Sequence, residues 1–485
     1  MILHFLSLSF VVFFILVLIL YYIVKLKYRW IVLLIVSIVF YLFTGYKAIV
    51  FLLFSICTTY LAARIIACND KQKSKFVLII TLILNIGFLF FLKYFINAIP
   101  LINHVIPGIS ITIPELIIPM GISFYTLQSA GYLIDVYRED VMPEKNFAKY
   151  ALFISFFPHI LQGPIASYHQ LASQLIYPKP FSYDSFKFSL QLILWGCFKK
   201  MVIADRAGII VDMVHSNITE YAGFELIITA ILYSIQLYTD FSGFVDVSRG
   251  VAGAFGIDLA HNFNWPYFSQ SIQEFWRRWH ISLSTWLKKY VYIPLGGSRK
   301  GTIRKYLNIL ATFFVSGLWH GYGLSFIAWG LLHGAYQVIG SIKDGFKTKL
   351  QNNPKLRFTQ PNKIFKIVTC FCLVTFAWIF FRAASLTDAL IYIKQMFSSF
   401  NIWILFNADK FNMGMLPVEY MLLVLSIFTL VVIEYLQGKY KLREIIAKQP
   451  IVFRWLIYFI SISVVIIFGS YGPAYNSSSF IYGNF

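Results

Sequence analysis

The sequence predicts an all-α, polytopic integral membrane protein, and its composition and the length of its apolar runs carry this prediction. Hydrophobic residues make up 59% of the chain and charged residues only 13%, whereas an ordinary soluble domain carries about 25% charged residues. Several runs approach the roughly 20 apolar residues that a helix needs to cross a bilayer. The short alternating strands of an outer-membrane barrel are not seen. We therefore expect about 11–13 transmembrane helices.

The predicted spans begin close to the N-terminus. Residues 5–24 form a long apolar run that no charged residue precedes. They are therefore interpreted as the first span rather than as a cleaved signal, which would have a basic start. The other predicted spans are residues 30–44, 48–66, 76–98, 117–136, 187–204, 224–239, 306–319, 323–341, 365–382, 418–435 and 455–470.

The basic excess of the chain also fits a membrane protein. Lys and Arg number 41 against 21 Asp and Glu, which gives a formal charge of +20. In a soluble protein such an excess would suggest a nucleic-acid partner, but in membrane proteins Lys and Arg concentrate in cytoplasmic loops. Basic clusters at 25–29, 64–75, 343–357 and 439–448 share one side if the N-terminus lies outside. The last span then takes the C-terminus outside as well. We expect membrane lipids, not nucleic acid, around this chain.

Two regions do not fit simple spans. Residues 145–186 contain an apolar stretch that is interrupted by Pro158, Gly163 and Pro164, and such residues break helices unless neighbours satisfy the freed backbone groups. Residues 257–305 mix Trp and Tyr with Arg and Lys, a mixture that favours the headgroup level. Neither region is expected to cross as a simple helix, and we expect the second to form interfacial or re-entrant helices on the cytoplasmic side.

Two histidines are the strongest candidates for chemistry. His320 ends an apolar run between Gly317 and Gly321, and ionisable groups inside a membrane are functional candidates. A neutral imidazole there can take a proton from a hydroxyl and return it to a leaving thiolate. A hydrogen-bonded residue at a helix end fits the pattern of His320 equally well, and His280 beside Trp279 also fits an interfacial anchor. No HxxxH or HExxH pair or zinc-like cysteine spacing indicates a metal.

Asp240 is the acidic candidate within the apolar body. A lone buried carboxylate is costly unless it is paired or protonated, so we expect a partner such as Arg277, Arg278 or Arg249 and a structural role. The sequence has no GxSxG elbow, phosphate-binding loop or dinucleotide fingerprint. Hydrolase, nucleotide-driven and redox mechanisms therefore have no positive support.

Several motifs resemble the membrane-bound O-acyltransferase family, specifically its bacterial branch of alginate and peptidoglycan O-acetyltransferases, which also includes the teichoic acid D-alanyl transferase. They are Tyr238–Gly243 (YTDFSG), Asn262–Asn264 with Pro266–Tyr267, Phe275–Ser284 (FWRRWHISLS), Tyr292–Gly297 (YIPLGG) and Gly317–Gly321 (GLWHG). Weaker similarity covers Pro119–Phe124 and Phe157–Ile165. The resemblance therefore extends over most of the chain.

The resemblance implies that His320 and His280 are the two catalytic positions. It also implies a ring of helices around a thinned centre, where a cytoplasmic and an external funnel nearly meet at the catalytic histidine. We expect a single domain over residues 1–485, with N-terminal helices (1–140), a catalytic core with re-entrant segments (141–345), and C-terminal helices with an external tail (346–485). Residues expected to bind the donor or support the site are Trp319, Trp276, Arg277, Arg278, Asp240 and Asn264.

The implied function is an O-acetyltransferase in a bacterial cytoplasmic membrane. The chain would pass acetyl from a cytoplasmic thioester, acetyl-CoA or an acyl carrier, to hydroxyls of a cell-wall or secreted polysaccharide, with no bound cofactor and with an external partner protein that completes transfer. D-alanyl transfer to teichoic acid is a close alternative. A proton-coupled transporter is another, although its paired halves are not seen.

The C-terminal tail is the last candidate. It carries Phe480-Ile481-Tyr482 and Phe485, and the acetylating branch commonly ends in a similar aromatic motif, although Gly483 and Asn484 depart from it. We hypothesise that Tyr482 accepts the acetyl group from the site of His320 as a transient ester, because covalent relay divides a difficult transfer into two easier ones. Anchoring of the aromatic tail at the membrane interface is the alternative.

Overall fold

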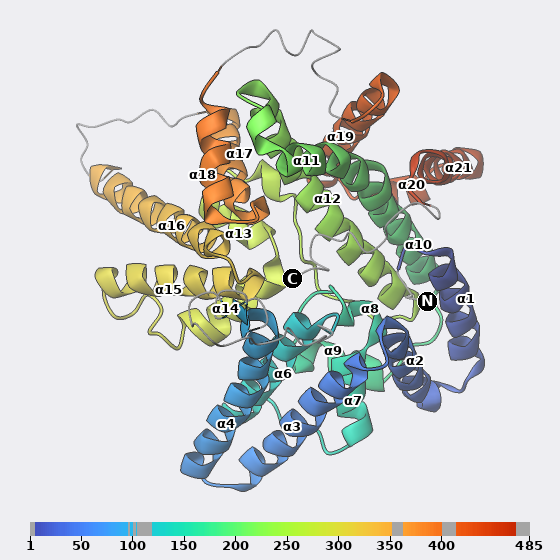
Figure 1. Ribbon diagram of the computed structural model, residues 1–485. Coiled ribbons are helices and arrows are strands. Elements are labelled where there is room, and N and C mark those ends of the chain that lie inside the picture. Colours follow the sequence, from blue (N-terminus) through green and yellow to red (C-terminus); the bar gives the residue numbers. More distant parts are fainter. Residues whose placement is uncertain are drawn as a thin grey trace. The chain divides into compact units, whose positions relative to one another are not determined.

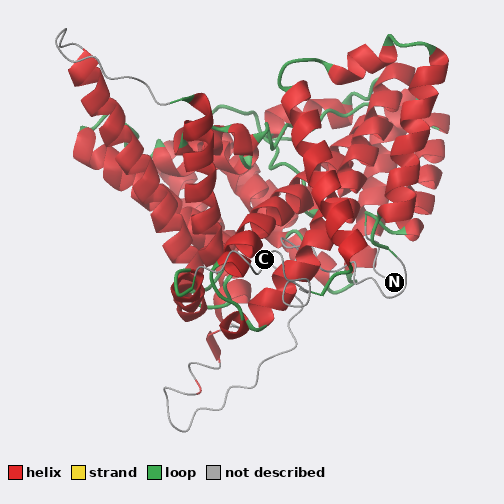
Figure 2. Cartoon of the chain, turned by 90° about the horizontal axis from the view of Figure 1, so that it is seen from above, coloured by secondary structure: helices red, strands yellow, loops and turns green. Residues whose placement is uncertain are grey.

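The computed structural model describes residues 5–95, 98–99, 103, 119–351, 362–399 and 414–471. In these residues the chain is helical and contains no strand (Figures 1 and 2). It divides into two compact units, one built from the described parts of residues 1–196 and 244–260, the other from those of 197–243 and 261–474. The all-α prediction is confirmed.

Within the described residues every predicted span coincides with a helix, and residues 96–97 and 117–118 of two predicted spans lie outside them. In the first unit the helices are α1 (Leu8–Ile23), α2 (Arg29–Thr44), α3 (Ala48–Cys68), α4 (Lys71–Phe90), α6 (Ile122–Tyr137), α7 (Phe147–Ser155), α8 (Phe157–Ile160), α9 (Tyr168–Ile176) and α10 (Tyr183–Cys197). In the second they are α11 (Asp205–Ser216), α13 (Ile272–Arg278), α14 (Ile281–Leu287), α15 (Thr302–His320), α16 (Leu324–Gln351), α17 (Lys363–Arg382), α18 (Leu386–Met396), α19 (Pro417–Gln437), α20 (Leu442–Ala447) and α21 (Ile451–Phe468).

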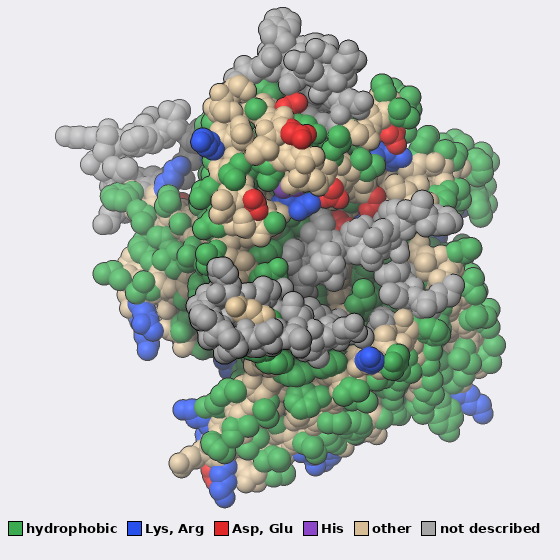
Figure 3. Space-filling view, in the orientation of Figure 1, with side chains coloured by type: hydrophobic (Ala, Val, Ile, Leu, Met, Phe, Trp, Pro, Cys, Tyr) green, Lys and Arg blue, Asp and Glu red, His purple; other side chains and the backbone are tan. Residues whose placement is uncertain are grey.

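Six helical segments of the described chain are long and apolar enough to cross a membrane. They are Leu26–Phe43, Ala48–Cys68, Lys71–Phe95, Lys363–Arg382, Pro417–Gln437 and Ile451–Phe468. Their outer faces carry exposed large side chains such as Ile83, Phe428 and Phe459, and hydrophobic side chains cover much of the face shown in Figure 3. Such surface suits lipid rather than water.

The first unit is held together by aromatic packing and by buried hydroxyl contacts. Phe5 lies against Phe40 and Phe244, with ring centroids 5.6 and 5.0 Å apart. Thr59 of α3 is hydrogen-bonded to Tyr150 of α7 at 2.7 Å. Helix α4 begins with a side-chain cap at Asp70, whose carboxylate accepts two backbone N–H groups of the helix.

Helix α12 (Phe224–Ala254) runs for 31 residues, past the predicted end at residue 239. The predicted span stopped before Asp240 because a carboxylate interrupts an apolar run. In the structure that carboxylate is neutralised by an ion pair, so the helix continues through it. Residues up to Gly243 belong to the second unit and the rest to the first.

Helices α15 and α16 form a tight hairpin in the second unit, and glycines allow their close approach. A Cβ atom at Gly317 would lie 2.5 Å from the carbonyl oxygen of Phe326, and one at Gly330 would lie 3.3 Å from the Cα atom of Gly317. Only a residue without a side chain fits at these two points. The hairpin places His320, at the end of α15, next to the first turns of α16.

The two regions predicted not to span do contain short helices. Residues 145–186 hold α7, α8 and α9, and residues 257–305 hold α13, α14 and the π-helical turn Lys288–Tyr292. All are far shorter than the roughly 20 residues that a span needs. Their position at the cytoplasmic headgroups stays a prediction.

Candidate active site

His320 is the last residue of α15, and the helix ends there because extended backbone begins at Gly321. The side chain is 2% exposed. Aromatic rings surround it, with centroids of Trp319 at 4.8 Å, Trp329 at 5.0 Å and Phe381 at 5.3 Å. The sequence placed this histidine at a helix end in apolar surroundings, and the structure agrees.

His280 occupies the turn between α13 and α14 in the left-handed conformation, with φ 43° and ψ 54°. Asn262 fixes this turn, because its carbonyl accepts the N–H of Ile281 at 3.0 Å and its side chain accepts the N–H of Ser282 at 2.9 Å. Backbone at positive φ is uncommon outside glycine, and such strain collects at functional sites. The fold therefore holds His280 in a costly conformation, which the sequence alone did not reveal.

The His280 ring is buried and neutral. It lies outside the predicted spans, and burial lowers the pKa of His280 to about 3, because a low-dielectric environment disfavours the charged form. Neither ring nitrogen has a hydrogen-bond partner among the described residues. A buried imidazole of this kind is free to bind a group of another molecule.

The structure brings the two candidate histidines close together. Their ring centroids are 6.5 Å apart, and the ring of Trp319 lies 6.1 Å from His280 and 4.8 Å from His320. This separation exceeds direct hydrogen-bond reach between the ring nitrogens. The pair is therefore suited to act on opposite sides of one small polar group rather than on each other.

The supporting residues predicted around the histidines are buried, half-buried or exposed, with Trp319 and Arg278 half-buried. Trp276 is buried and donates its indole N–H to Nδ1 of His333 at 3.3 Å. Arg277 and Asn264 are exposed, and the N–H of Asn264 is bonded to the carbonyl of Arg278 at 2.9 Å. Donor binding by these residues stays a prediction.

The predicted arginine partner of Asp240 is wrong. Asp240 pairs with Lys200 at 2.5 Å, and Lys200 also pairs with Asp205 at 2.7 Å. Arg278 instead pairs with Glu274 at 2.5 Å, and Arg249 with Asp246 at 3.8 Å. The sequence did not indicate Lys200 as the partner, because Lys200 lies within the predicted span 187–204. In the structure it belongs to the π-helical segment η3 (Phe198–Ala204) and pairs with Asp240 of α12.

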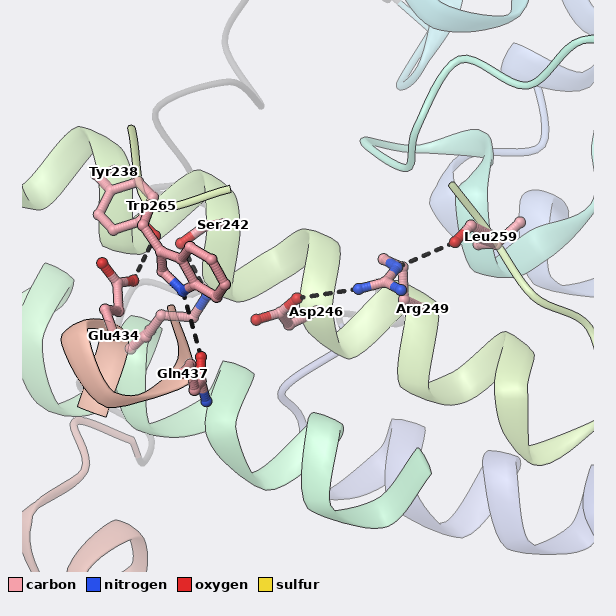
Figure 4. Close-up of polar contacts among 9 residues, drawn as sticks. Tyr238, Ser242, Asp246, Arg249, Leu259, Trp265, Glu434 and Gln437 are labelled. Atoms are coloured by element: carbon pink, nitrogen blue, oxygen red, sulfur yellow. Dashed lines mark hydrogen bonds and ion pairs between the residues drawn. The ribbon is translucent and has the colours of Figure 1, made fainter. Parts of the chain in front are cut away.

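Further polar contacts join this buried region to α19 (Figure 4). Tyr238 donates to a carboxylate oxygen of Glu434, and Trp265 donates to Gln437 at 3.4 Å. Lys199 donates to Ser242 at 2.9 Å. The first contact joins α12 to α19, the second joins the segment before Pro266 to α19, and the third joins η3 to α12. The described residues hold no group of three or more His, Cys, Asp or Glu side chains that could bind a metal ion.

Breaking the Lys200 ion pair should destabilise the protein. We expect Lys200→Met to cost about 3–5 kcal/mol, because it removes the shared cation of two buried ion pairs, those with Asp240 and Asp205. Asp240→Asn should cost less, since Lys200 keeps Asp205. Thermal unfolding in detergent and membrane abundance measure both effects, with Lys441→Met in an exposed pair as the control. Wild-type abundance of Asp240→Asn with complete inactivity would contradict the structural role and make Asp240 catalytic.

Comparison with known proteins identifies relatives of this chain. The model of the membrane-bound O-acyltransferase family matches residues 142–381, which include both histidines. The chain is 35% identical to the probable alginate O-acetylase AlgI of Pseudomonas aeruginosa, over 82% of this chain and 75% of that protein. It is 36% identical to the peptidoglycan O-acetyltransferase of Helicobacter pylori, over 76% of this chain and 73% of that protein.

A more distant relative is the teichoic acid D-alanyltransferase of Bacillus subtilis, 28% identical over 68% of this chain and 83% of that protein. The identity to the two O-acetylating proteins and the extent of the match decide the family. This multi-pass membrane chain therefore belongs to the membrane-bound O-acyltransferase family and is an acyltransferase.

Proposed function

We propose that this protein is an O-acetyltransferase that passes acetyl from a cytoplasmic thioester to hydroxyls of a cell-wall or secreted polysaccharide. The single observation that carries the proposal is the pair of buried histidines, His280 and His320, with ring centroids 6.5 Å apart. The named activities of the two similar proteins, an alginate O-acetylase and a peptidoglycan O-acetyltransferase, support acetyl as the group and polysaccharide as the acceptor.

The proposed chemistry uses His320 as the general base. The attacking hydroxyl gives its proton to the ring of His320, and the hydroxyl oxygen bonds to the thioester carbonyl carbon. The carbon–sulfur bond then breaks, and His320 passes the proton to the departing thiolate. Neutral His280 is proposed to hydrogen-bond the reacting group from the other side. No metal or bound cofactor is proposed, and the donor is acetyl-CoA or an acyl carrier thioester.

The proposal places the protein in a bacterial cytoplasmic membrane with both termini outside. Acetyl would enter from the cytoplasmic side and leave outside, where a separate partner protein would complete transfer to the polymer. The basic segment with Arg277 and Arg278 is proposed to attract the anionic donor.

The proposed function is tested by restoring the gene to a deletion strain. We expect loss of ester-linked acetate from the wall or secreted polymer in the deletion strain and its return with the wild-type gene. Membrane vesicles supplied with labelled acetyl thioester should then release labelled acetate esters outside. Loss and return of ester-linked D-alanine instead of acetate would establish the D-alanyl alternative, and proton flux without ester formation would establish a transporter.

The tail relay has its own test. Tyr482 lies outside the described residues, so the hypothesis rests on the sequence alone. We expect Tyr482→Phe to abolish polymer acetylation, because it keeps the ring and deletes only the nucleophilic oxygen. Acetate content of the polymer is the measurement, and Tyr471→Phe just before the tail is the control. Wild-type acetylation by Tyr482→Phe would rule out the relay and leave the tail as an interfacial anchor.

A further inference from the structure

A hydrogen-bond donor lies buried without a partner beside His320. Trp329 of α16 is 0% exposed, and its ring packs edge-on against the ring of His320 with centroids 5.0 Å apart. No described residue accepts the indole Nε1–H of Trp329. Buried indole N–H groups usually find an acceptor, so this one calls for an acceptor supplied by another molecule.

A second unpartnered donor follows one helical turn later. His333 is also 0% exposed, and its Nδ1 accepts the indole N–H of Trp276 at 3.3 Å. Indole can only donate, so Nδ1 carries no proton. A buried imidazolium without a carboxylate partner would be costly, and no such partner occurs in the described chain. The neutral ring therefore carries its proton on Nε2, which has no acceptor among the described residues.

The two donor groups lie close together on one helix. Residues 329 and 333 are four apart and share a face of α16, and their rings lie 5.2 Å apart. The surrounding side chains are aromatic, with Trp378 stacked on Trp329 at 5.6 Å and Phe381 at 5.1 Å from it. Two N–H donors in an apolar setting match one oxygen atom with two lone pairs, and they do not match a cation.

We propose that Trp329 Nε1–H and His333 Nε2–H bind the carbonyl oxygen of the acyl group during its transfer at His320. This rests on the proposed function. When the hydroxyl oxygen bonds to the carbonyl carbon, the carbonyl π electrons move onto that oxygen, and its negative charge is stabilised by the two donors. The electrons return as the carbon–sulfur bond breaks and the thiolate leaves with the proton from His320. Preorganised donors in a water-free site stabilise such charge strongly.

The test replaces each ring by a phenyl ring, which has no N–H group. We expect Trp329→Phe and His333→Phe each to lower kcat for acetyl transfer by about 10²–10³-fold, with little change in KM for the thioester. Labelled acetyl thioester and purified full-length protein supply the assay, with rates expressed per folded molecule. The double variant should lose less than the product of the two single losses, because both donors act on one oxygen. Trp455→Phe, at an exposed tryptophan, is the control.

A second variant tests the proposal even if Trp329→Phe fails to fold. Replacing Trp329 by benzothienylalanine, which has sulfur in place of the indole N–H, keeps shape and packing. A loss of kcat in this variant supports the proposal. An unchanged kcat overturns it whatever the unfolding temperature, and a lower unfolding temperature would then assign the Trp329 N–H to a structural role. If the wild-type protein transfers D-alanyl instead of acetyl, the proposed function fails, and the same variants assayed with D-alanyl thioester decide this proposal separately.

Discussion

Replacing His320 by alanine is expected to lower acyl transfer by about 10²–10⁴-fold, the contribution of one general base. The reason lies in the position of the ring, which is 2% exposed and encircled by Trp319, Trp329 and Phe381. The ring of His280 lies nearby, with its centroid 6.5 Å away. Ester-linked acetate in the polymer and thiol release in vesicles both measure the effect.

The protein should remain folded without the His320 ring. Alanine favours helix and suits the end of α15, so abundance in the membrane is expected to stay near wild type. His169→Ala provides the control, because His169 is exposed in the first unit. Near-normal acetylation by His320→Ala would contradict a catalytic role and leave His320 as a buried residue at a helix end.

Periodicity and apolar length predicted the helices well because both are local properties of the sequence. Each predicted span became a helix, and even the interrupted segment around Pro158 became the short helices α7, α8 and α9. The prediction failed where a charge is compensated at long range. Asp240 was taken as the end of a span, yet Lys200, forty residues earlier in the chain, neutralises it at 2.5 Å and lets α12 continue.

The sequence could indicate the two histidines of the candidate site, but it could not indicate the roles of the residues around them. The GLWHG and FWRRWHISLS motifs led to His320 and His280, and the structure brings their rings to 6.5 Å. The role of Trp329 could not be read from the sequence, because a tryptophan in an apolar helix is usually a packing residue. Its importance depends on an N–H group left without an acceptor, which is a property of three-dimensional packing. The left-handed backbone of His280 has no sequence signal either.

Replacing His280 by glycine is expected to abolish most acyl transfer, by at least about 10²-fold if the imidazole binds the reacting group, while leaving the protein folded. Glycine is the informative substitution because His280 has φ 43°. Glycine adopts this conformation without strain, whereas alanine there would add a backbone penalty to any catalytic loss.

The matched control for this variant is Glu139→Gly. Glu139 also has positive φ, at 66°, but it is exposed and lies in the first unit. Both glycine variants should relieve backbone strain to a similar extent, so unfolding temperatures should not fall in either. Only His280→Gly should lose activity, and His280→Asn, which tolerates the same backbone and can still donate one hydrogen bond, should recover part of it. Full activity in His280→Gly would show that the His280 imidazole has only a packing role. Loss of activity in both glycine variants would show that the change of backbone flexibility, and not the lost imidazole, causes the loss.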